Sequence, residues 1–245
     1  MDISWLSRTA LIVGNEVLEK LTQSKVLIVG MGGVGSFAAE FIVRAGIGNV
    51  TIVDGDIVEP SNRNRQLPAL ATTEGQYKVE VMKERLLAIN PELNITAINH
   101  FMTPDDMKSL LSSQSFDYAV DAIDSISPKI QMLVLCYQTG TRVVSSMGAG
   151  GKLDPTQLKI VDISQTHTCK LARYVRKRLK KYKIYTGIKA VFSTEKVIAH
   201  SLMYTQSRFK KSAYGTISYL PAAFGGACAS VVIRDLIEQY GKQGK

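Results

Sequence analysis

Apolar and polar positions alternate along the chain with two periods, and the change of period predicts where strands give way to helices. Residues 25–30 (KVLIVG) are a continuous apolar run typical of a buried strand, whereas residues 34–45 carry apolar side chains at helical spacing. A second apolar run follows at 50–54. This order predicts a strand, a helix and a parallel strand of one sheet. The alternation continues with predicted helices at 74–90, 105–113 and 126–139 and predicted strands at 94–98, 117–121 and 142–146.

The last third of the chain is expected to complete the same sheet. It carries predicted strands at 158–163, 189–193 and 217–220, a helix at 170–183, and a final helix from Pro221 to about Tyr240. No internal repeat, low-complexity tract or linker interrupts the pattern. We therefore predict an α/β fold with a Rossmann-like, doubly wound, mostly parallel sheet that the C-terminal strands extend. We expect one domain over residues 1–245, made of a helical arm (1–24), a core (25–150) and a C-terminal part (151–245).

The composition is that of a globular protein. Of 245 residues, 45% are hydrophobic and 21% are charged, which excludes disorder, collagen and coiled coils. The N-terminal residues show no signal-peptide pattern, which favours a cytoplasmic location. Residues 212–233 carry no charge and are long enough to cross a bilayer. Their glycines and Pro221 favour a buried strand followed by a core helix, so membrane association is the lesser alternative.

The three cysteines form no C-x-x-C pair, so neither a disulfide framework nor a structural zinc site is predicted. Cys228 lies in an apolar segment and is expected to be a small buried side chain, like most free cysteines of this kind. Cys169 opens the basic helix, where a thiolate role is the lesser alternative.

Positive charge is concentrated in the C-terminal part. Residues 1–150 hold 12 basic and 16 acidic side chains, whereas residues 151–245 hold 18 and 5. The densest stretch is 170–183, where eight of fourteen residues are basic and apolar residues recur at helical spacing. We predict a helix with one buried and one cationic face, and a polyanion such as a nucleic acid is the partner that this face favours over plain solvent.

A glycine-rich loop joins the first predicted strand to the next helix. Gly30, Gly32, Gly33 and Gly35 stand where backbone N–H groups can approach a phosphate at a helix N-terminus. Asp54, at the end of the second strand, can accept hydrogen bonds from ribose hydroxyls. These features alone describe an NAD-dependent enzyme equally well.

The residues after Asp54 favour a nucleoside triphosphate instead. The motif D-G-D is followed by SNRNRQ at 61–66, by Lys78 at a helix and by Asp124 after a strand. Two arginines and a lysine provide more cations than a diphosphate needs, and a carboxylate such as Asp124 can hold Mg²⁺ beside phosphates. The alternative for Arg63 and Arg65 is pairing with acidic neighbours on a surface loop.

These motifs together resemble the ATP-dependent adenylating enzymes similar to the ubiquitin-activating enzyme, which include the ThiF and MoeB proteins. The resemblance rests on GMGGVG, DGD, SNRNRQ, Lys78 and DAIDS at 121–125. It implies that residues 25–150 are an ATP-binding core, and that a carboxylate is activated as an acyl adenylate. It also implies a homodimer in which Arg8 reaches the ATP of the partner subunit. The implied ATP and Mg²⁺ site consists of the four loop glycines, Asp54 for the ribose, Asn62, Arg65 and Lys78 for the triphosphate, Asp124 for the metal, and Asp56, Ser61 and Ser125 beside them, with Arg8, Arg65, Lys78 and Asp124 as the catalytic residues.

Within these enzymes the chain is most similar to the tRNA threonylcarbamoyladenosine dehydratases. The segments that carry this resemblance include ERLLAINPEL, VDAIDSISPK and SSMGAGGKLDPTQLKIVDISQTH. It implies a tRNA carrying threonylcarbamoyladenosine as substrate, and a cysteine desulfurase type sulfur-transfer protein as an additional partner. Pro68 and Cys169-Lys170 depart from the pattern outside the ATP ligands. The candidate tRNA contacts are Lys170, Arg173, Arg176, Lys177, Lys180 and Lys181.

Three alternatives remain open from the sequence. The chain could adenylate the C-terminus of a ubiquitin-like sulfur carrier, although such activators usually bind zinc through two C-x-x-C pairs. It could also be a non-catalytic module that binds nucleotide or RNA, or an NAD-dependent dehydrogenase. The basic C-terminal part favours the tRNA substrate, because a small carrier protein does not require phosphate contacts.

Overall fold

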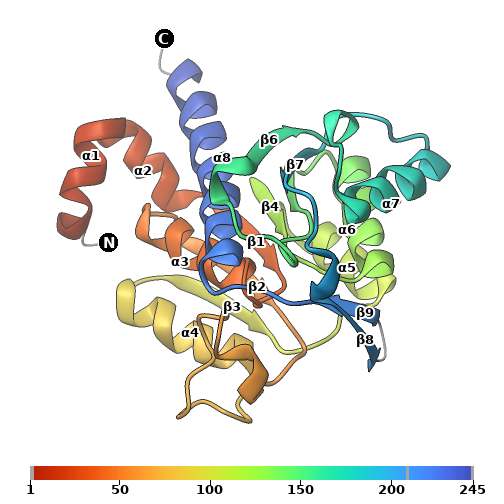
Figure 1. Cartoon of the computed structure of the whole chain (residues 1–245). Helices are drawn as coiled ribbons and strands as arrows, with labels where there is room; N and C mark the ends of the chain where they lie inside the picture. The colour runs from red at the N-terminus through yellow and green to blue at the C-terminus, as the bar shows by residue number, and fades with distance from the viewer. Residues whose placement is uncertain (1–2, 208–209, 244–245) are drawn as a thin grey trace.

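A single mixed sheet of seven strands forms the centre of the molecule (Figure 1). The computed structural model describes residues 3–207 and 210–243. In sheet order the strands are β3 (Asn94–Ile98), β2 (Asn49–Val53), β1 (Lys25–Val29), β4 (Tyr118–Asp121), β5 (Val143–Ser146), β7 (Lys189–Ser193) and β6 (Leu158–Asp162). All neighbours pair in parallel except β6, which runs antiparallel to β7 at one edge. The predicted Rossmann-like fold with C-terminal strands in the same sheet is therefore confirmed.

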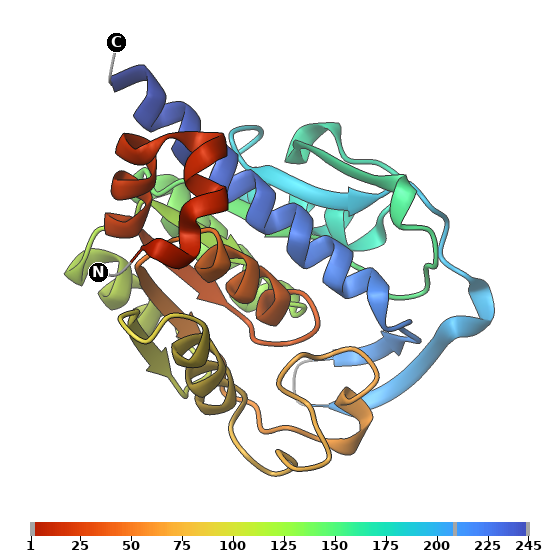
Figure 2. The same ribbon diagram turned by 90° about the vertical axis from the view of Figure 1, so that its left-hand side faces the viewer.

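Helices cover both faces of the sheet, which explains why the central strands are apolar on both sides. One face is covered by α2 (Asn15–Gln23), α3 (Gly35–Arg44), α4 (Lys78–Ile89) and α8 (Tyr219–Gln243). The other is covered by α5 (Pro104–Ser113), α6 (Ile126–Thr139) and α7 (Lys170–Leu179). Alternate residues of β1 point into the two cores: Val26 and Ile28 into the first, Leu27 and Val29 into the second. The short helix α1 (Ser7–Val13) precedes α2 at the outside of the first layer (Figure 2).

Several predicted elements are confirmed with their bounds, among them β3, α6 and β7. The helix predicted at 74–90 begins only at Lys78, because Gly75 has a φ of 79° and Tyr77 pairs with Ile57 as an isolated bridge. The helix predicted at 170–183 ends at Leu179 and continues as a 3-10 turn, Lys180–Tyr182.

The segment before the last helix differs from the prediction. The strand predicted at 217–220 is wrong: α8 begins at Tyr219, and Pro221 lies in its first turn, where a missing N–H costs no helical hydrogen bond. The antiparallel pair β8 (Leu202–Ser207) and β9 (Lys210–Tyr214) was not predicted. This pair is a separate two-stranded sheet, at the lower right of Figure 1.

Helix α8 accounts for the uncharged C-terminal segment. By length and composition, residues 219–242 could cross a membrane, but 56% of the apolar window is buried inside the fold. Leu220, Phe224 and Leu236 of this helix belong to the first core. It also packs closely on α3, because a Cβ at Gly225 would lie 2.9 Å from the Phe37 Cβ. The expected core helix is thus found within this segment.

Candidate functional site

The glycine-rich loop lies between the carboxyl end of β1 and the start of α3, enclosed by three other segments. Gly30 has a φ of 96°, and a Cβ there would lie 2.8 Å from the Ala122 carbonyl oxygen. A Cβ at Gly33 would lie 3.0 Å from the Pro221 Cβ and 3.1 Å from the Arg65 carbonyl oxygen. A Cβ at Gly35 would collide with the Gly30 carbonyl oxygen. Glycine at these three positions therefore keeps side chains out of the loop, as a phosphate-binding loop requires.

Asp54 connects the end of β2 to this loop. Its Oδ2 accepts a hydrogen bond of 2.6 Å from the Met31 N–H, and its Oδ1 accepts one of 2.8 Å from the Asp56 N–H. Burial raises the pKa of the Asp54 carboxyl, although the Lys78 ammonium and the two N–H donors act in the opposite direction. The carboxylate is thus fixed beside the loop with lone pairs left for further donors, such as hydroxyl groups.

Lys78 is held at the first position of α4. Its side chain is 5% exposed, and its Nζ lies 2.9 Å from Oδ2 of Asp56. The Lys78 N–H also donates to the Asp56 carbonyl oxygen over 3.1 Å, which fixes the helix start against the segment after β2. The ammonium has donors left beyond this one ion pair, so it can also bind an anion at this edge.

The segment 59–66 places Arg65 beside the glycine loop. A 3-10 turn, Pro60–Asn62, begins it, and the buried Asn62 accepts the Glu59 N–H through Oδ1 over 3.2 Å. Arg65 Nη1 donates to the Ser61 carbonyl oxygen over 2.9 Å and to Asn64 Oδ1 over 2.8 Å. Burial lowers the pKa of Arg65, while the Asp124 carboxylate raises it. Arg65 and Asp124 therefore act on each other across the mouth of the loop.

Asp124 follows β4 on an exposed turn, and the Ser125 hydroxyl donates to its Oδ1 over 3.3 Å. Within the described residues, no group of three or more His, Cys, Asp or Glu side chains could hold a metal by itself. Mg²⁺ commonly takes one or two carboxylates and completes its shell with phosphate oxygens and water. A single exposed carboxylate beside a phosphate loop fits that mode.

Gln66 is a site residue to which the sequence assigned no role. Its Oε1 is buried, and it is the one side-chain N or O atom that lacks a hydrogen-bond partner among those buried in the described ranges. Its Nε2 lies 3.8 Å from the position of a Cβ at Gly32, so this side chain faces the phosphate loop. Together with Arg65, Lys78 and the loop N–H groups, the polar groups present fit a nucleoside triphosphate.

One predicted catalytic residue, Arg8, lies apart from this edge of the sheet. Arg8 is exposed on α1, and the neighbouring Leu6 packs on Gly46, just before the amino end of β2. Asp54 follows the other end of that five-residue strand, about 17 Å away at 3.3–3.4 Å per residue. The fold of one chain therefore does not bring Arg8 to the other candidates.

The basic helix α7 begins near the site edge and extends away from it. A Cβ at Gly148, after the carboxyl end of β5, would lie 4.0 Å from the Leu171 Cβ. The ten residues of α7 span about 15 Å. Among the predicted tRNA contacts, Lys170, Arg173, Lys177, Lys180 and Lys181 are exposed. Arg176 is partly buried and donates from Nη1 to the Thr166 hydroxyl.

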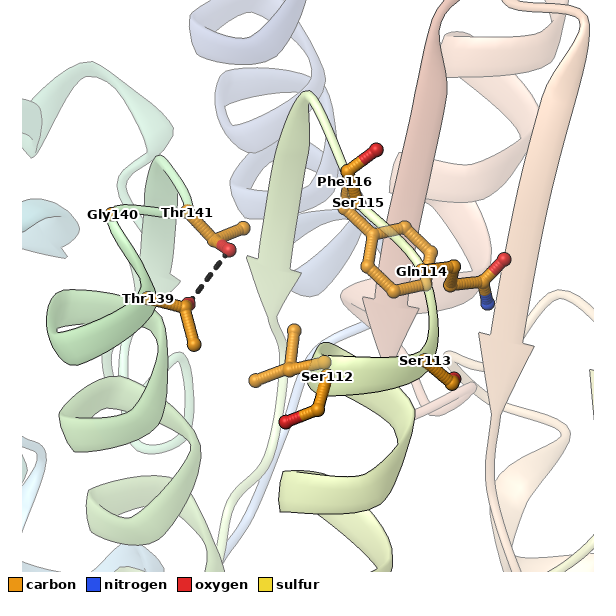
Figure 3. Close-up of a pocket in the computed structure, with 9 residues that line it drawn as sticks. Ser112, Ser113, Gln114, Ser115, Phe116, Thr139, Gly140 and Thr141 are labelled. Carbon is orange, nitrogen blue, oxygen red and sulfur yellow. Dashed lines mark hydrogen bonds between the residues drawn. The ribbon is translucent and has the colours of Figure 1, made fainter.

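A cavity of about 410 Å³ lies at the opposite edge of the sheet (Figure 3). It is formed where α5 and α6 end, before β4 and β5 begin, and Ser112, Ser115, Thr139 and Thr141 are among its lining residues. None of its lining side chains is charged. It therefore lacks the cations that a triphosphate requires and is not part of the candidate site.

The cysteines give a prediction that concerns reactivity. Burial raises the pKa of both Cys136 and Cys228 to about 12. On the order of one thiol in ten thousand is then ionised at pH 8, and only thiolates react with alkylating reagents. We expect neither cysteine to be alkylated by iodoacetamide in the native protein at pH 8, and both to be alkylated in guanidinium chloride, as read by peptide mass spectrometry. Alkylation of either cysteine in the native state would contradict the burial described above.

Comparisons with known proteins identify the family of the chain. A model of the ThiF family matches residues 6–244. The tRNA threonylcarbamoyladenosine dehydratase of Bacillus subtilis is 44% identical over 192 residues, which are 78% of this chain and 75% of that protein. The enzyme of the same name from Escherichia coli is 34% identical over 98% of this chain and 97% of its own length. The crystal structure of that E. coli enzyme, TcdA, in complex with ATP matches with a TM-score of 0.89 over 98% of this chain and 97% of that one. The chain therefore belongs to the ThiF family, and within it to the group of tRNA threonylcarbamoyladenosine dehydratases.

Proposed function

We propose that this protein catalyses the ATP-dependent dehydration of threonylcarbamoyladenosine in tRNA. The threonyl carboxylate attacks the α-phosphorus of ATP, and pyrophosphate leaves. The modified side chain then closes on the activated carbonyl carbon, and AMP leaves, so that the nucleoside loses one water overall. The observation that carries this proposal is the convergence of the glycine loop, Asp54, Arg65, Lys78 and Asp124 at one edge of the sheet, in a chain whose relatives bear this activity in their names.

We assign the site residues by their chemistry. Asp54 accepts hydrogen bonds from the ribose hydroxyls, and the N–H groups of the glycine loop bind phosphate oxygens. Arg65, Lys78 and the amide of Asn62 offset charge on the triphosphate, while Ser61, Asp56 and Ser125 support them through the contacts described above. Asp124 would hold Mg²⁺, which when bound stabilises negative charge on the phosphates.

AMP release tests the proposal. Purified protein is incubated with ATP and MgCl₂ together with threonylcarbamoyl-modified tRNA, unmodified tRNA or no tRNA, and the nucleosides are analysed by mass. We expect AMP only with modified tRNA, together with a nucleoside lighter by one water. AMP release that requires a sulfur-carrier protein, or no AMP release at all despite ATP and tRNA binding, would refute the proposal. ATP and tRNA both occur in the cytoplasm, where we place the reaction. We propose that residues 1–245 form the single domain that carries it out.

A homodimer is proposed because α1 has an unburied apolar face. No residue of α1 is buried, and Leu11 and Ile12 are 88% and 86% exposed. Two adjacent exposed aliphatic side chains on a short helix are typical of a surface that packs against another protein. Because Arg8 lies on the same helix and far from the site of its own chain, we propose that it contacts the ATP bound by a second copy.

Mixing two inactive variants tests this arrangement. We expect Arg8→Ala and Asp124→Ala to be inactive alone, while a mixture refolded or co-expressed together regains up to about a quarter of wild-type AMP release. Random pairing makes half of the dimers mixed. In a mixed dimer both defects fall in one of the two composite sites, so the other site is intact and a quarter of all sites are active. A mixture as inactive as its components would show that Arg8 acts within one chain or only supports the fold.

The exposed face of α7 is proposed as part of the tRNA-binding surface. Lys170, Arg173 and Lys177 stand on it and form no ion pair within the part of the chain that the structure describes, and the helix begins close to the site edge. Neutralising phosphates releases counterions, so such contacts make binding depend steeply on salt. A tRNA that enters at this face would reach the ATP site past Gly148, which lies between the two.

Charge reversal on α7 should weaken tRNA binding and leave ATP binding intact. For Lys170→Glu/Arg173→Glu/Lys177→Glu we expect the salt slope of log K for tRNA to fall by about two to three, since each phosphate contact contributes about 0.7–0.9. Lys20→Glu/Lys83→Glu, on the other face of the sheet, is the matched control. The measurement is filter binding at several KCl concentrations. An unchanged slope in the triple variant would exclude α7 from the tRNA surface.

A further inference from the structure

A fully buried lysine lies directly beneath the segment that carries Asp124. Lys129 on α6 and Asp121 at the end of β4 are both 0% exposed, and Nζ lies 2.6 Å from Oδ2. The same Nζ donates to Ser145 Oγ over 3.2 Å and to the Ser146 carbonyl oxygen over 2.9 Å. The Ser145 hydroxyl in turn donates to Asp121 Oδ2 over 2.5 Å. Every donor of the ammonium group therefore has an acceptor.

An ion pair in this position is an expensive way to stabilise a fold. Removing two charges from water costs several kcal/mol per ion, and well-packed apolar residues often replace such pairs with no loss of stability. The surroundings are apolar: Ala119 on the same face of β4 and Leu133, one turn along α6, are fully buried in the second core. Stability alone therefore does not account for charged residues at these two positions.

One end of the pair controls the path of the chain toward Asp124. The second carboxylate oxygen of Asp121, Oδ1, accepts the Ile123 N–H over 3.1 Å. The intervening Ala122 N–H donates to the Val29 carbonyl oxygen over 2.9 Å, and the Ala122 carbonyl oxygen is the atom against which Gly30 packs. Asp121 thus fixes residues 121–123 against the phosphate loop, one residue before Asp124.

The other end holds the segment after β5. Lys129 donates to the Ser145 hydroxyl and to the Ser146 carbonyl oxygen, and these two serines are the last residues of β5. The chain continues through Gly148, beside Leu171 of α7, to Gly151, whose N–H donates to the Gly215 carbonyl oxygen over 2.8 Å. Lys129 therefore connects two segments: the residues after β4, which carry Asp124, and the residues after β5, which lie between Asp124 and the basic helix α7.

We propose that Lys129 is a positioning residue for the reaction. Through Asp121 it holds Asp124 at the metal position beside the phosphate loop, and through Ser146 it fixes the neighbouring segment 147–151. This inference rests on the metal role proposed for Asp124. It predicts that loss of the Lys129–Asp121 pair weakens ATP binding in the presence of Mg²⁺ far more than ATP binding without metal.

The test compares variants by two readouts, ATP affinity by isothermal titration calorimetry and melting temperature. Lys129→Met and Asp121→Asn each leave one buried charge without its partner, so both are expected to lower the melting temperature. The double variant Asp121→Asn/Lys129→Met carries neither charge and is expected to recover much of that loss. Ser145→Ala removes one hydroxyl from the network and keeps a folded variant in the series. The control is Tyr118→Phe/Asp235→Asn. In the wild type the Tyr118 hydroxyl and the Lys189 ammonium both donate to the Asp235 carboxylate, at the opposite edge of the sheet.

Each variant is titrated with ATP in MgCl₂ and, separately, in EDTA. In MgCl₂ we expect the double variant to bind ATP at least tenfold more weakly than wild type, which corresponds to about 1.4 kcal/mol. In EDTA we expect its ATP affinity to lie within about twofold of wild type. Ser145→Ala should show a smaller loss with the same dependence on metal. The control should lose stability without any change in the ratio of the two affinities.

Two outcomes would overturn the inference. One is a stably folded double variant that binds ATP like wild type in MgCl₂, since the pair would then serve the fold alone. The other is wild-type ATP affinity that does not depend on Mg²⁺, which would remove the proposed metal role of Asp124 as well. Neither titration contains tRNA, so the dehydratase assay judges the proposed reaction separately.

Discussion

Replacing Asp124 by Asn is expected to reduce modified-tRNA-dependent AMP release about 1000-fold, which corresponds to about 4 kcal/mol of transition-state stabilisation. The side chain is exposed on the turn after β4, where its carboxylate interacts with Arg65 across the mouth of the glycine loop. Asn keeps the shape and the oxygen atom but lacks the charge that holds a divalent cation among phosphates. Because the side chain is exposed, the melting temperature should change little.

The measurement is single-turnover AMP release at saturating tRNA and at an MgCl₂ concentration that just saturates the wild-type protein. Asp105→Asn, an exposed carboxylate at the start of α5, is the matched control and should remain within about twofold of wild type, as expected for surface substitutions. Higher MgCl₂ should restore part of the lost activity of Asp124→Asn, because a weakened site is refilled by mass action. Activity within tenfold of wild type at ordinary MgCl₂ would contradict the role proposed for Asp124.

Replacing Lys78 by Met is expected to lower kcat/KM for ATP about 100-fold, or 2.7 kcal/mol. The stem of Lys78 is buried at the start of α4, and Met fills that space without the ammonium group that meets Asp56. The phosphates then lose a buried cation, whose effect is large because little water screens it. Asp56 is half exposed and can be hydrated, so the fold should tolerate the change.

Initial rates over a range of ATP concentrations separate the two contributions to this loss. A rise in KM alone would mean that Lys78 binds ATP equally in the ground and transition states, whereas a fall in kcat would mean that it acts mainly in the transition state. Lys83→Met, on the same helix, is the control for the loss of a lysine side chain. If Lys78→Met retained wild-type kcat/KM, the phosphate contact assigned to this residue would be excluded.

The fold was largely predictable because its signals are local. Buried parallel strands read as continuous apolar runs, and β1 and β7, in which all residues but the first are buried, lie where such runs occur. The incorrect strand at 217–220 arose because a short apolar run before a proline is ambiguous between a strand and a first helical turn. The pair β8 and β9 was missed because its residues are mostly polar and lie outside the main sheet, so no apolar period indicates it.

The candidate site was predictable to a similar degree, and for a related reason. The glycines, Asp54 and Asp124 follow strand ends of a parallel sheet, and Lys78 begins the helix after one of these strands. Such ends meet at one edge, where α/β proteins bind ligands. Gln66 and Lys129 gave no comparable signal, because what sets them apart is burial together with hydrogen-bond partners from other segments. A glutamine in a polar loop or a lysine in a helix is ordinarily a solvent-exposed residue.

The close contact between Gly33 and Pro221 means that the glycine-rich loop cannot fold correctly without the C-terminal helix. The first turn of α8 forms one wall of that loop, although about 190 residues of chain lie between them. The same helix packs on β4 and β5, where Val120 and Val144 belong to the first core. A fragment that ends near residue 150 would therefore expose an apolar sheet face and leave the loop open on one side. Adding residues 151–245 as a second polypeptide should restore both features, so split halves of this protein should report their own reassembly through ATP binding.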